Sequence, residues 1–319
     1  MMAIFSIKIS IGFIALVLSS FLIFIINKIF LSKNLIDKVN KRSSHSSSAS
    51  RSGGSSIYIT LFIFSLYFYF IGYEIYDFSL LVPLSLLLIV GLYDDIYRLD
   101  FKLKFIFQII AAKIIIDNGL IIDNLHGFLG IFELGRFIAQ ILTIFIIVAI
   151  VNSINFIDGI DGLALSIFIL FVISFEYFSI NTTPFYSLSL LLIFILIPLY
   201  YFNFRKKNKV FLGDSGSLFL GGVISIYVIY ILSNNYIIKP EFDIHKLIFV
   251  FSILSFPITD IVRIFLVRIM NGKSPFLPDK KHIHHLVLQK TRSHFYTITI
   301  IIAASILLII SIQYFKNWI

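Results

Sequence analysis

One short segment of the chain combines the residue types that bind metal ions and phosphates. It contains two carboxamides and two carboxylates, Asn152, Asn155, Asp158 and Asp161, with a glycine after each aspartate. It follows an apolar run, residues 138–150, that resembles part of a membrane helix. Charged groups so close to a bilayer are costly and are rarely without function. Four oxygen donors on a glycine-containing turn suit Mg²⁺, which keeps positions free for a phosphate substrate. The segment therefore predicts metal-dependent phosphate chemistry at a membrane face.

Two further acidic motifs stand at the ends of other apolar runs. The adjacent carboxylates of Asp94 and Asp95 repel each other, so the pair is a candidate base or metal-organising group. The structural alternative is a solvated loop in which these acids pair with Arg98 or Lys102. A Gly-Asp-Ser-Gly turn containing Asp214 precedes another apolar run, and a helix N-terminus favours phosphate. Asp214 is therefore a candidate Mg²⁺ ligand, or the cap of that helix.

Two segments supply cations and histidines. His282, His284 and His285 lie close together, and histidines can donate hydrogen bonds to phosphate oxygens; a polar surface loop is the alternative. No cysteine or helix-spaced partner supports a zinc site here. His45 and Arg51 belong to a serine-rich stretch that is either a flexible loop or a loop facing phosphate or nucleotide. The other histidines, which stand outside these motifs, are His126, His245 and His294.

The composition places these motifs in a membrane protein. Hydrophobic residues make up 59% of the chain, charged residues 13%, and the mean hydropathy is +0.98. The 319 residues leave room for about ten spans and for no soluble appendage. We therefore expect an all-α, polytopic fold in a single membrane-embedded domain, residues 1–319, and a first apolar run that is retained. The apolar runs predict spans near Ala3–Leu31, Ile57–Gly72, Phe78–Leu92, Phe105–Ile116, Phe137–Val151, Leu163–Phe178, Phe185–Tyr201, Leu218–Leu232, Leu247–Val267 and Thr297–Ile312.

Basic residues predict the orientation of the spans. Lysine and arginine concentrate in alternate loops, which the positive-inside rule places in the cytoplasm, so both termini are expected in the periplasm. All the motifs above fall on this cytoplasmic face, where we expect them to form one site. The formal net charge of +9 is explained by topology and by anionic lipid headgroups, or by attraction of an anionic substrate. Nucleic-acid binding is not expected, because no basic helix stands free of the membrane.

Taken together, the motifs resemble those of the polyprenyl-phosphate N-acetylhexosamine-1-phosphate transferases. The resemblance rests on four co-linear motifs, and the segment from Arg42 to Gly54 is similar to the family's first cytoplasmic loop. The motifs are Asp94-Asp95, Asn152-x-x-Asn155-x-x-Asp158-Gly-x-Asp161-Gly-Leu163, Phe211-Leu-Gly-Asp214-x-Gly-Ser217 and His282-Ile-His284-His285. The resemblance implies Mg²⁺-dependent transfer (Mn²⁺ being the alternative metal) of a sugar 1-phosphate from a UDP-N-acetylhexosamine to undecaprenyl phosphate, with release of UMP. It also implies an active site on cytoplasmic loops of the bacterial inner membrane.

The resemblance further implies individual roles. Asp214 would bind Mg²⁺ with Asn155, and Asp94, Asp95 and Asp158 would be catalytic. Substrate contacts would come from the residues His45, Arg51, Asn152, Asp161, His282, His284 and His285. Ile283 interrupts the histidine run, which resembles the branch that transfers GlcNAc 1-phosphate more than the phospho-MurNAc-pentapeptide branch. A homodimer is compatible with the resemblance.

A cation-coupled transporter is the alternative from another class. Transporters place acids near the bilayer midplane, whereas Asp94, Asp158 and Asp214 lie at span ends. Asp260 comes nearest to an intramembrane acid, and Arg263, one helical turn further on, is its expected partner.

Overall fold

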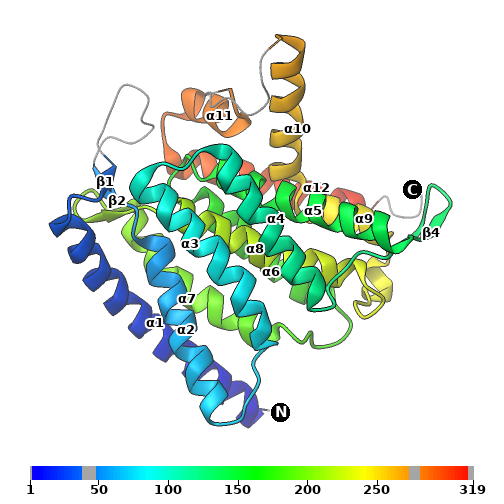
Figure 1. Ribbon diagram of the computed structural model, residues 1–319, viewed down its shortest axis with the longest axis horizontal. Coiled ribbons are helices and arrows are strands. Elements are labelled where there is room, and N and C mark those ends of the chain that lie inside the picture. Colours follow the sequence, from blue (N-terminus) through cyan, green and yellow to red (C-terminus); the bar gives the residue numbers. More distant parts are fainter. Residues whose placement is uncertain (1, 38–47, 273–280, 315–319) are drawn as a thin grey trace. The chain divides into compact units, whose positions relative to one another are not determined.

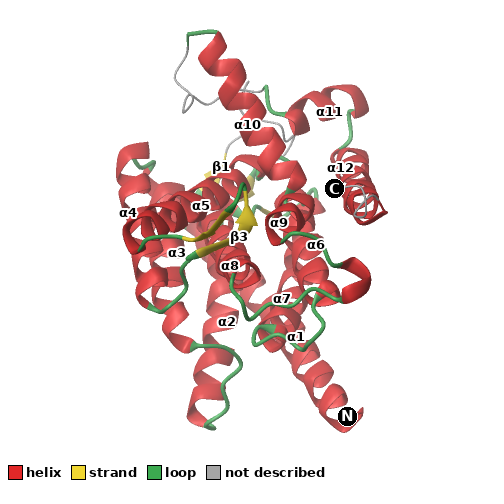
Figure 2. Cartoon of the chain, turned by 90° about the vertical axis from the view of Figure 1, so that its right-hand side faces the viewer, coloured by secondary structure: helices red, strands yellow, loops and turns green. Residues whose placement is uncertain are grey.

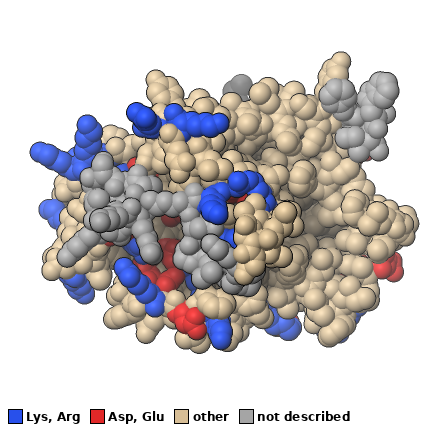
Figure 3. All heavy atoms as spheres, turned by 90° about the horizontal axis from the view of Figure 1, so that it is seen from above, with Lys and Arg blue, Asp and Glu red and all other residues tan. Residues whose placement is uncertain are grey.

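The computed structural model describes residues 2–37, 48–272 and 281–314, and the described backbone is mostly helical (Figures 1 and 2). Seven of the described helices are long and apolar enough to cross a membrane, and a bent helix pair is an eighth candidate. Figure 3 views the molecule from above, and on this face Lys and Arg side chains lie around a group of Asp and Glu side chains. The prediction of a mostly helical membrane protein is therefore confirmed. The count of ten spans and the side of each terminus stay predictions.

The chain divides into two compact units, each built from two stretches of sequence. One unit comprises Met1–Gly119 and Thr182–Val223, and the other comprises Leu120–Asn181 and Ile224–Ile319. Helix α8 (Gly213–Leu232) contributes its first residues to the first unit and its remainder to the second. The expected single domain stays a prediction.

The first unit contains the long apolar helices of the N-terminal third. Helix α1 packs against α2 and α7, and α3 packs against α4 and α2. The Ser19 hydroxyl on α1 donates to the carbonyl of Ile195 on α7, which satisfies a polar group inside this apolar packing. The elements of the unit, besides α8, are α1 (Met2–Ser32), β1 (Ile36–Asp37), β2 (Ala49–Ser50), α2 (Gly53–Phe70), η1 (Phe78–Leu80), α3 (Leu81–Tyr97), α4 (Phe101–Asp117), α7 (Tyr186–Phe204) and β5 (Lys209–Val210).

A tight turn reverses the chain between α3 and α4. Helix α3 ends where Arg98 adopts a left-handed conformation, with φ of 59°. Asp100 then caps α4, because its side chain accepts a hydrogen bond from the backbone N–H of Lys102. The turn directs α4 back along α3 and so brings the first turn of α4 beside the carboxyl-terminal end of α3.

Three very short strands hold the segment before α2 next to the segment before α8. Strand β2 pairs antiparallel with β1 and parallel with β5. The pairing continues beyond the strands, since the N–H groups of Gly53 and Gly54 donate to the carbonyls of Phe211 and Leu212. Residues that are more than 150 positions apart in the chain are thereby fixed side by side.

The second unit contains most of the helices that follow residue 120. Helix α5 packs against α10 and α6, while α12 packs against α6, α9, α10 and α11. The elements of this unit, besides the end of α8, are β3 (Asn124–Phe128), β4 (Ile131–Glu133), α5 (Arg136–Ile157), α6 (Leu163–Phe178), η2 (Pro240–Phe242), α9 (Lys246–Ile253), α10 (Ser255–Met270), α11 (Ile283–Thr291) and α12 (His294–Tyr314).

The expected span Leu247–Val267 consists of two helices, α9 and α10, and its crossing of the membrane stays a prediction. The chain bends by 83° between α9 and α10, with Leu254 at the break. Pro257 stands in the first turn of α10, where its missing N–H removes no helical hydrogen bond. The bend gives α10 a different direction from α9, and α10 carries the buried Asp260.

Candidate functional site

The first unit brings together two of the predicted acidic motifs. Lys104, in the first turn of α4, donates from Nζ to Asp94 Oδ2 and to Asp214 Oδ2, each at 2.9 Å. The Lys104 side chain is only 13% exposed and that of Asp94 15% exposed. Because one ammonium group lies between both carboxylates, it offsets their mutual repulsion. The expected structural partners of Asp94, Arg98 or Lys102, are therefore replaced by Lys104.

Asp95 has a different environment from its neighbour Asp94. Its Oδ1 accepts the backbone N–H of Asp214 and its Oδ2 accepts that of Ser215, each at 3.0 Å. These are N–H groups of the first turn of α8, which have no partner within the helix, so Asp95 satisfies them from outside. The Asp95 side chain is 1% exposed, and Arg51 Nη1 lies 3.6 Å from Oδ1. Asp95 therefore fixes the turn that presents Asp214.

Both cations of this cluster are held in the charged state. Burial lowers the pKa of Lys104, but the carboxylates of Asp214 and Asp94 raise that pKa by more, so it lies above its ordinary value. Burial likewise lowers the pKa of Arg51, while Asp37 and Asp95 raise it above its usual range. Arg51 also donates from Nη2 to Asp37 Oδ2 at 3.0 Å. The cluster is thus a set of paired charges at the start of α8.

The end of the predicted serine-rich loop, from Arg51 to Gly54, has a structural role in this cluster. A Cβ added to Gly54 would lie 2.1 Å from the backbone nitrogen of Gly216 on α8. Only glycine permits that approach, and the approach places Arg51 beside Asp95. His45, the other residue predicted in this loop, lies outside the described residues.

Replacing Gly54 by alanine should therefore destabilise the protein by about 1–3 kcal/mol, because backbone atoms on α8 cannot yield to the added methyl group. Thermal unfolding of the detergent-purified protein measures the effect. Gly135→Ala is the control: its added Cβ would meet no atom within 4 Å, and its φ of −58° is open to any residue. A Gly54→Ala midpoint equal to that of wild type would contradict the close packing.

In the second unit, the amide and carboxylate segment begins on a helix rather than on a turn. Helix α5 continues to Ile157, so Asn152 and Asn155 share one face of its last turns. The Asn152 amide donates to the Val148 carbonyl at 2.8 Å. Asp158 is the C-cap of α5, and Asp161 lies in the turn before α6. The expected turn therefore holds only the two aspartates.

Asp161 has a histidine partner that the sequence analysis did not single out. His294 Nδ1 lies 3.0 Å from Asp161 Oδ2 and 3.1 Å from the backbone nitrogen of Asp161. His294 opens α12, more than 130 positions further along the chain. No spacing rule connects the two residues, so only the fold could reveal this pair.

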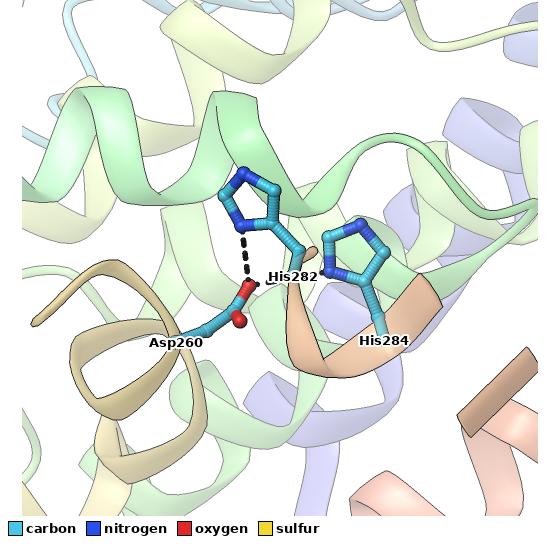
Figure 4. A group of neighbouring side chains, drawn as sticks. All are labelled: Asp260, His282 and His284. Carbon is cyan, nitrogen blue, oxygen red and sulfur yellow. Dashed lines mark hydrogen bonds and ion pairs between the residues drawn. The ribbon is translucent and has the colours of Figure 1, made fainter. Parts of the chain in front are cut away.

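The predicted histidine motif surrounds a buried aspartate (Figure 4). Asp260 Oδ2 accepts from His282 Nδ1 at 2.9 Å, and His284 Nδ1 lies 3.3 Å from the same oxygen. The prediction that Arg263 pairs with Asp260 is wrong, because Arg263 Nη1 donates to the Lys281 carbonyl instead. One donor atom each from Asp260, His282 and His284 lie within 4.8 Å of one another, close enough to hold a metal ion.

The histidine motif also meets the loop between α5 and α6. A Cβ added to Gly159 would lie 3.3 Å from the His285 ring and 3.4 Å from His284 Nε2. The rings of His284 and His285 are 4.3 Å apart, and the Phe156 ring is 5.8 Å from that of His282. The second unit thus brings Gly159 next to His284 and His285, whereas a common cytoplasmic site stays a prediction.

The predicted site residues fall into two clusters. The first unit gathers Arg51, Asp94, Asp95 and Asp214, and adds Lys104. In the second unit, Asp260 meets His282 and His284, His285 lies beside Gly159, and His294 meets Asp161. Asn152, Asn155 and Asp158 belong to the same unit, and their meeting with the histidines stays a prediction. The pairing of Asp214 with Asn155 around one metal ion stays a prediction.

Comparison with known proteins supports a common origin with one class of enzymes. The glycosyl transferase family 4 pattern matches residues 77–232, which include both acidic motifs of the first cluster. The chain is 32% identical to a probable undecaprenyl-phosphate N-acetylglucosaminyl 1-phosphate transferase of Bacillus subtilis (strain 168), over 92% of this chain and 81% of that protein. It is 34% identical to the undecaprenyl-phosphate alpha-N-acetylglucosaminyl 1-phosphate transferases of Pasteurella multocida (strain Pm70) and Haemophilus influenzae, over 89% of this chain and 81% of each relative.

Proposed function

Because the chain belongs to the polyprenyl-phosphate glycosyl-1-phosphate transferases of glycosyl transferase family 4, we propose that it transfers N-acetylglucosamine 1-phosphate from UDP-GlcNAc to undecaprenyl phosphate. UMP is released and a cell-envelope glycan is started. The enzyme works at the cytoplasmic face of the bacterial inner membrane. Family membership leaves the transporter alternative without support.

The observation that carries this proposal is the charge cluster of the first unit. Asp94 and Asp214 converge on the Lys104 ammonium, and Asp95 holds the first turn of α8 in place. Phosphoryl transfer requires little covalent chemistry from the protein, so alignment and charge neutralisation supply most of the rate. A cluster of fixed, paired charges at a helix N-terminus is suited to that task.

The donor set of this cluster fits Mg²⁺, the metal we propose, with Mn²⁺ as the alternative. The oxygens of Asp94 and Asp214 already share one cation, the ammonium of Lys104, and carboxylate oxygens are the ligands that Mg²⁺ prefers. We assign Asp214 as a metal ligand and keep Asn155 as the predicted second one. When bound, the metal supplies positive charge to the phosphate oxygens of the donor substrate.

The chain's own residues then have distinct tasks. An oxygen of the lipid phosphate forms a bond to the β-phosphorus of UDP-GlcNAc, the bond to the bridging oxygen breaks, and UMP leaves with that electron pair. Lys104 balances the charge of Asp94 and Asp214. Asp95, predicted as catalytic, is reassigned as a positioning residue, because backbone N–H groups occupy both of its oxygens.

The second cluster is assigned to the donor substrate. His282, His284 and His285 offer ring nitrogens to phosphate oxygens, and Asp158 and Asp161 border the nucleotide. Asn152 lies one helical turn before Asn155 on α5, so it can contact the same ligand. Asp158 keeps its predicted catalytic role.

Incubating the purified protein with Mg²⁺, undecaprenyl phosphate and radiolabelled donors tests the proposal. We expect a lipid-linked product and UMP with UDP-GlcNAc. UDP-GalNAc and UDP-MurNAc-pentapeptide are the competing donors, and product from either alone would change the assigned sugar. Absence of product with every donor would overturn the proposal.

Asp94→Asn should lower kcat by about 10²-fold while KM for the nucleotide sugar changes little, because the change removes a charge close to the transferred phosphate. Asparagine retains an oxygen that can accept the Leu99 N–H, which Asp94 Oδ1 accepts at 2.7 Å. Steady-state kinetics with varied UDP-GlcNAc separate the two constants. A change confined to KM would remove Asp94 from the chemistry.

A further inference from the structure

Asp260 is a buried acid that no predicted motif includes. It lies on α10, after the bend at Leu254, and is 1% exposed. Its two carboxylate oxygens have different partners: Oδ2 accepts from His282 Nδ1 at 2.9 Å, and Oδ1 accepts the backbone N–H of Ile283 at 2.6 Å. One side chain therefore contacts both a ring and the backbone of the histidine motif.

The contact with Ile283 fixes the start of a helix. Helix α11 runs from Ile283 to Thr291, and the Ile283 N–H is one of the groups that have no acceptor within the helix. The side chain of His282, the N-cap residue, makes no capping hydrogen bond, so Asp260 supplies this acceptor from another helix. The backbone that carries the histidines is thereby tied to α10.

The contact with His282 determines which ring nitrogen carries a proton. An ionised carboxylate can only accept hydrogen bonds, so the bond at 2.9 Å requires a proton on Nδ1. Nε2 lies on the opposite side of the ring from Asp260 (Figure 4). It is then the nitrogen of His282 that is offered to a ligand. In well-studied hydrolases, a buried aspartate selects the tautomer and orientation of a catalytic histidine in the same way.

His284 lies beside this pair and lacks a good hydrogen bond of its own. It is fully buried, its Nδ1 lies 3.3 Å from Asp260 Oδ2, and its Nε2 has no hydrogen-bond partner among the described residues. Burial lowers the pKa of His284, although Asp260 opposes that effect. A buried polar group without a partner costs free energy that a bound ligand can recover. The motif is therefore arranged for binding rather than for stability alone.

We propose that Asp260 is a positioning residue for the transfer reaction: it holds His282 as the Nδ1–H form and anchors α11, so that Nε2 faces the phosphate groups of the donor substrate. This role rests on the proposed function, whereas the pairing itself does not. Asp260, His282 and His284 then lie close together because His282 donates a hydrogen bond to the carboxylate, and not because the three residues bind a metal ion.

The pairing can be tested without any activity measurement. ¹⁵N NMR of the detergent-solubilised protein, labelled at histidine, reports the protonation of each ring nitrogen, and a His282→Gln sample assigns the signals. We expect a protonated Nδ1 on His282 in the wild-type protein. A bare Nδ1, or an Nδ1 bound to a metal ion that EDTA removes, would overturn the proposal.

The positioning role is tested by a double-mutant cycle. Asp260→Asn keeps the side-chain volume but turns an amide donor or a weaker acceptor toward Nδ1, so kcat/KM should fall by about 10–100-fold. In a His282→Gln background the same change should cost less than about threefold, because the ring through which Asp260 acts is gone. Asp260→Glu, which restores the carboxylate, should recover part of the loss.

Asp123→Asn is the matched control, because Asp123 is an exposed acid of the same unit. The activity of this variant should equal that of wild type. Additive losses from Asp260→Asn and His282→Gln would show that Asp260 does not act through His282. If no donor supports transfer but Nδ1 is protonated, the pairing stands and the proposed function fails. The two hypotheses are thus separated.

Discussion

Asp214→Asn should lower turnover by on the order of 10³-fold while the protein still accumulates in the membrane. The side chain is the proposed metal ligand, and loss of a group that neutralises charge in the transition state typically costs that much. The fold should persist, because Asp95 binds the backbone N–H of residue 214 and not its side chain. Radiolabelled product formation at saturating UDP-GlcNAc, with protein amount determined by immunoblot, measures the effect.

Asp117→Asn provides the control for this experiment. Asp117 is an acid of the same unit whose side chain is 60% exposed and is paired with Lys113 on the surface of α4. Surface ion pairs contribute little, so turnover should not change. If Asp214→Asn kept more than a tenth of wild-type turnover, Asp214 would be removed from the site.

Lys104→Met should produce the second large effect, because it leaves two carboxylates without their shared counter-charge. Breaking a largely buried ion pair by removing one partner typically costs about 3–5 kcal/mol. We expect a thermal midpoint several degrees below wild type in EDTA, and turnover reduced by at least about 10²-fold. The ammonium and a divalent ion use the same two oxygens, so Mg²⁺ should raise the midpoint of Lys104→Met more than that of wild type.

The comparison with Lys104→Arg separates charge from shape. Arginine retains the charge and can still bridge two carboxylates, so its midpoint in EDTA should lie close to that of wild type. A Lys104→Met variant with equal midpoints in EDTA and in Mg²⁺ would show that its carboxylates bind no metal. That result would also weaken the assignment of Asp214.

The sequence predicted the helices well because membrane helices are long, continuous apolar runs. Residues 137–151, for example, lie inside α5, and residues 185–201 begin at the N-cap of α7 and otherwise lie inside that helix. The bend at Leu254 was not predicted, because the residues next to it on both sides are mostly apolar and continue the run. Asn152 and Asn155 were expected beyond a helix end, since polar residues followed an apolar run. The helix continues through them because one face of α5 can stay polar.

The acidic and histidine motifs were predictable from composition and spacing, but their partners were not. Lys104 belongs to a basic segment that was explained by topology and lipid headgroups or by an anionic substrate, and it meets Asp214 across 110 positions of sequence. Asp260 was expected to pair within its own helix, where Arg263 stands at the usual spacing. The fold offers it His282 and Ile283 instead, and only the meeting of α10 with the start of α11 brings them within reach.

The parallel pairing of β2 with β5 constrains how the protein is assembled during synthesis. Ser50 is made early, yet its strand partner Val210 leaves the ribosome 160 residues later. Until then Asp95 has no N–H groups of residues 214 and 215 to accept from, and Lys104 has only one of its two carboxylates. The first four helices must therefore form with their charged ends incompletely paired, and a nascent chain stopped before residue 182 should be a preferred target for membrane quality control.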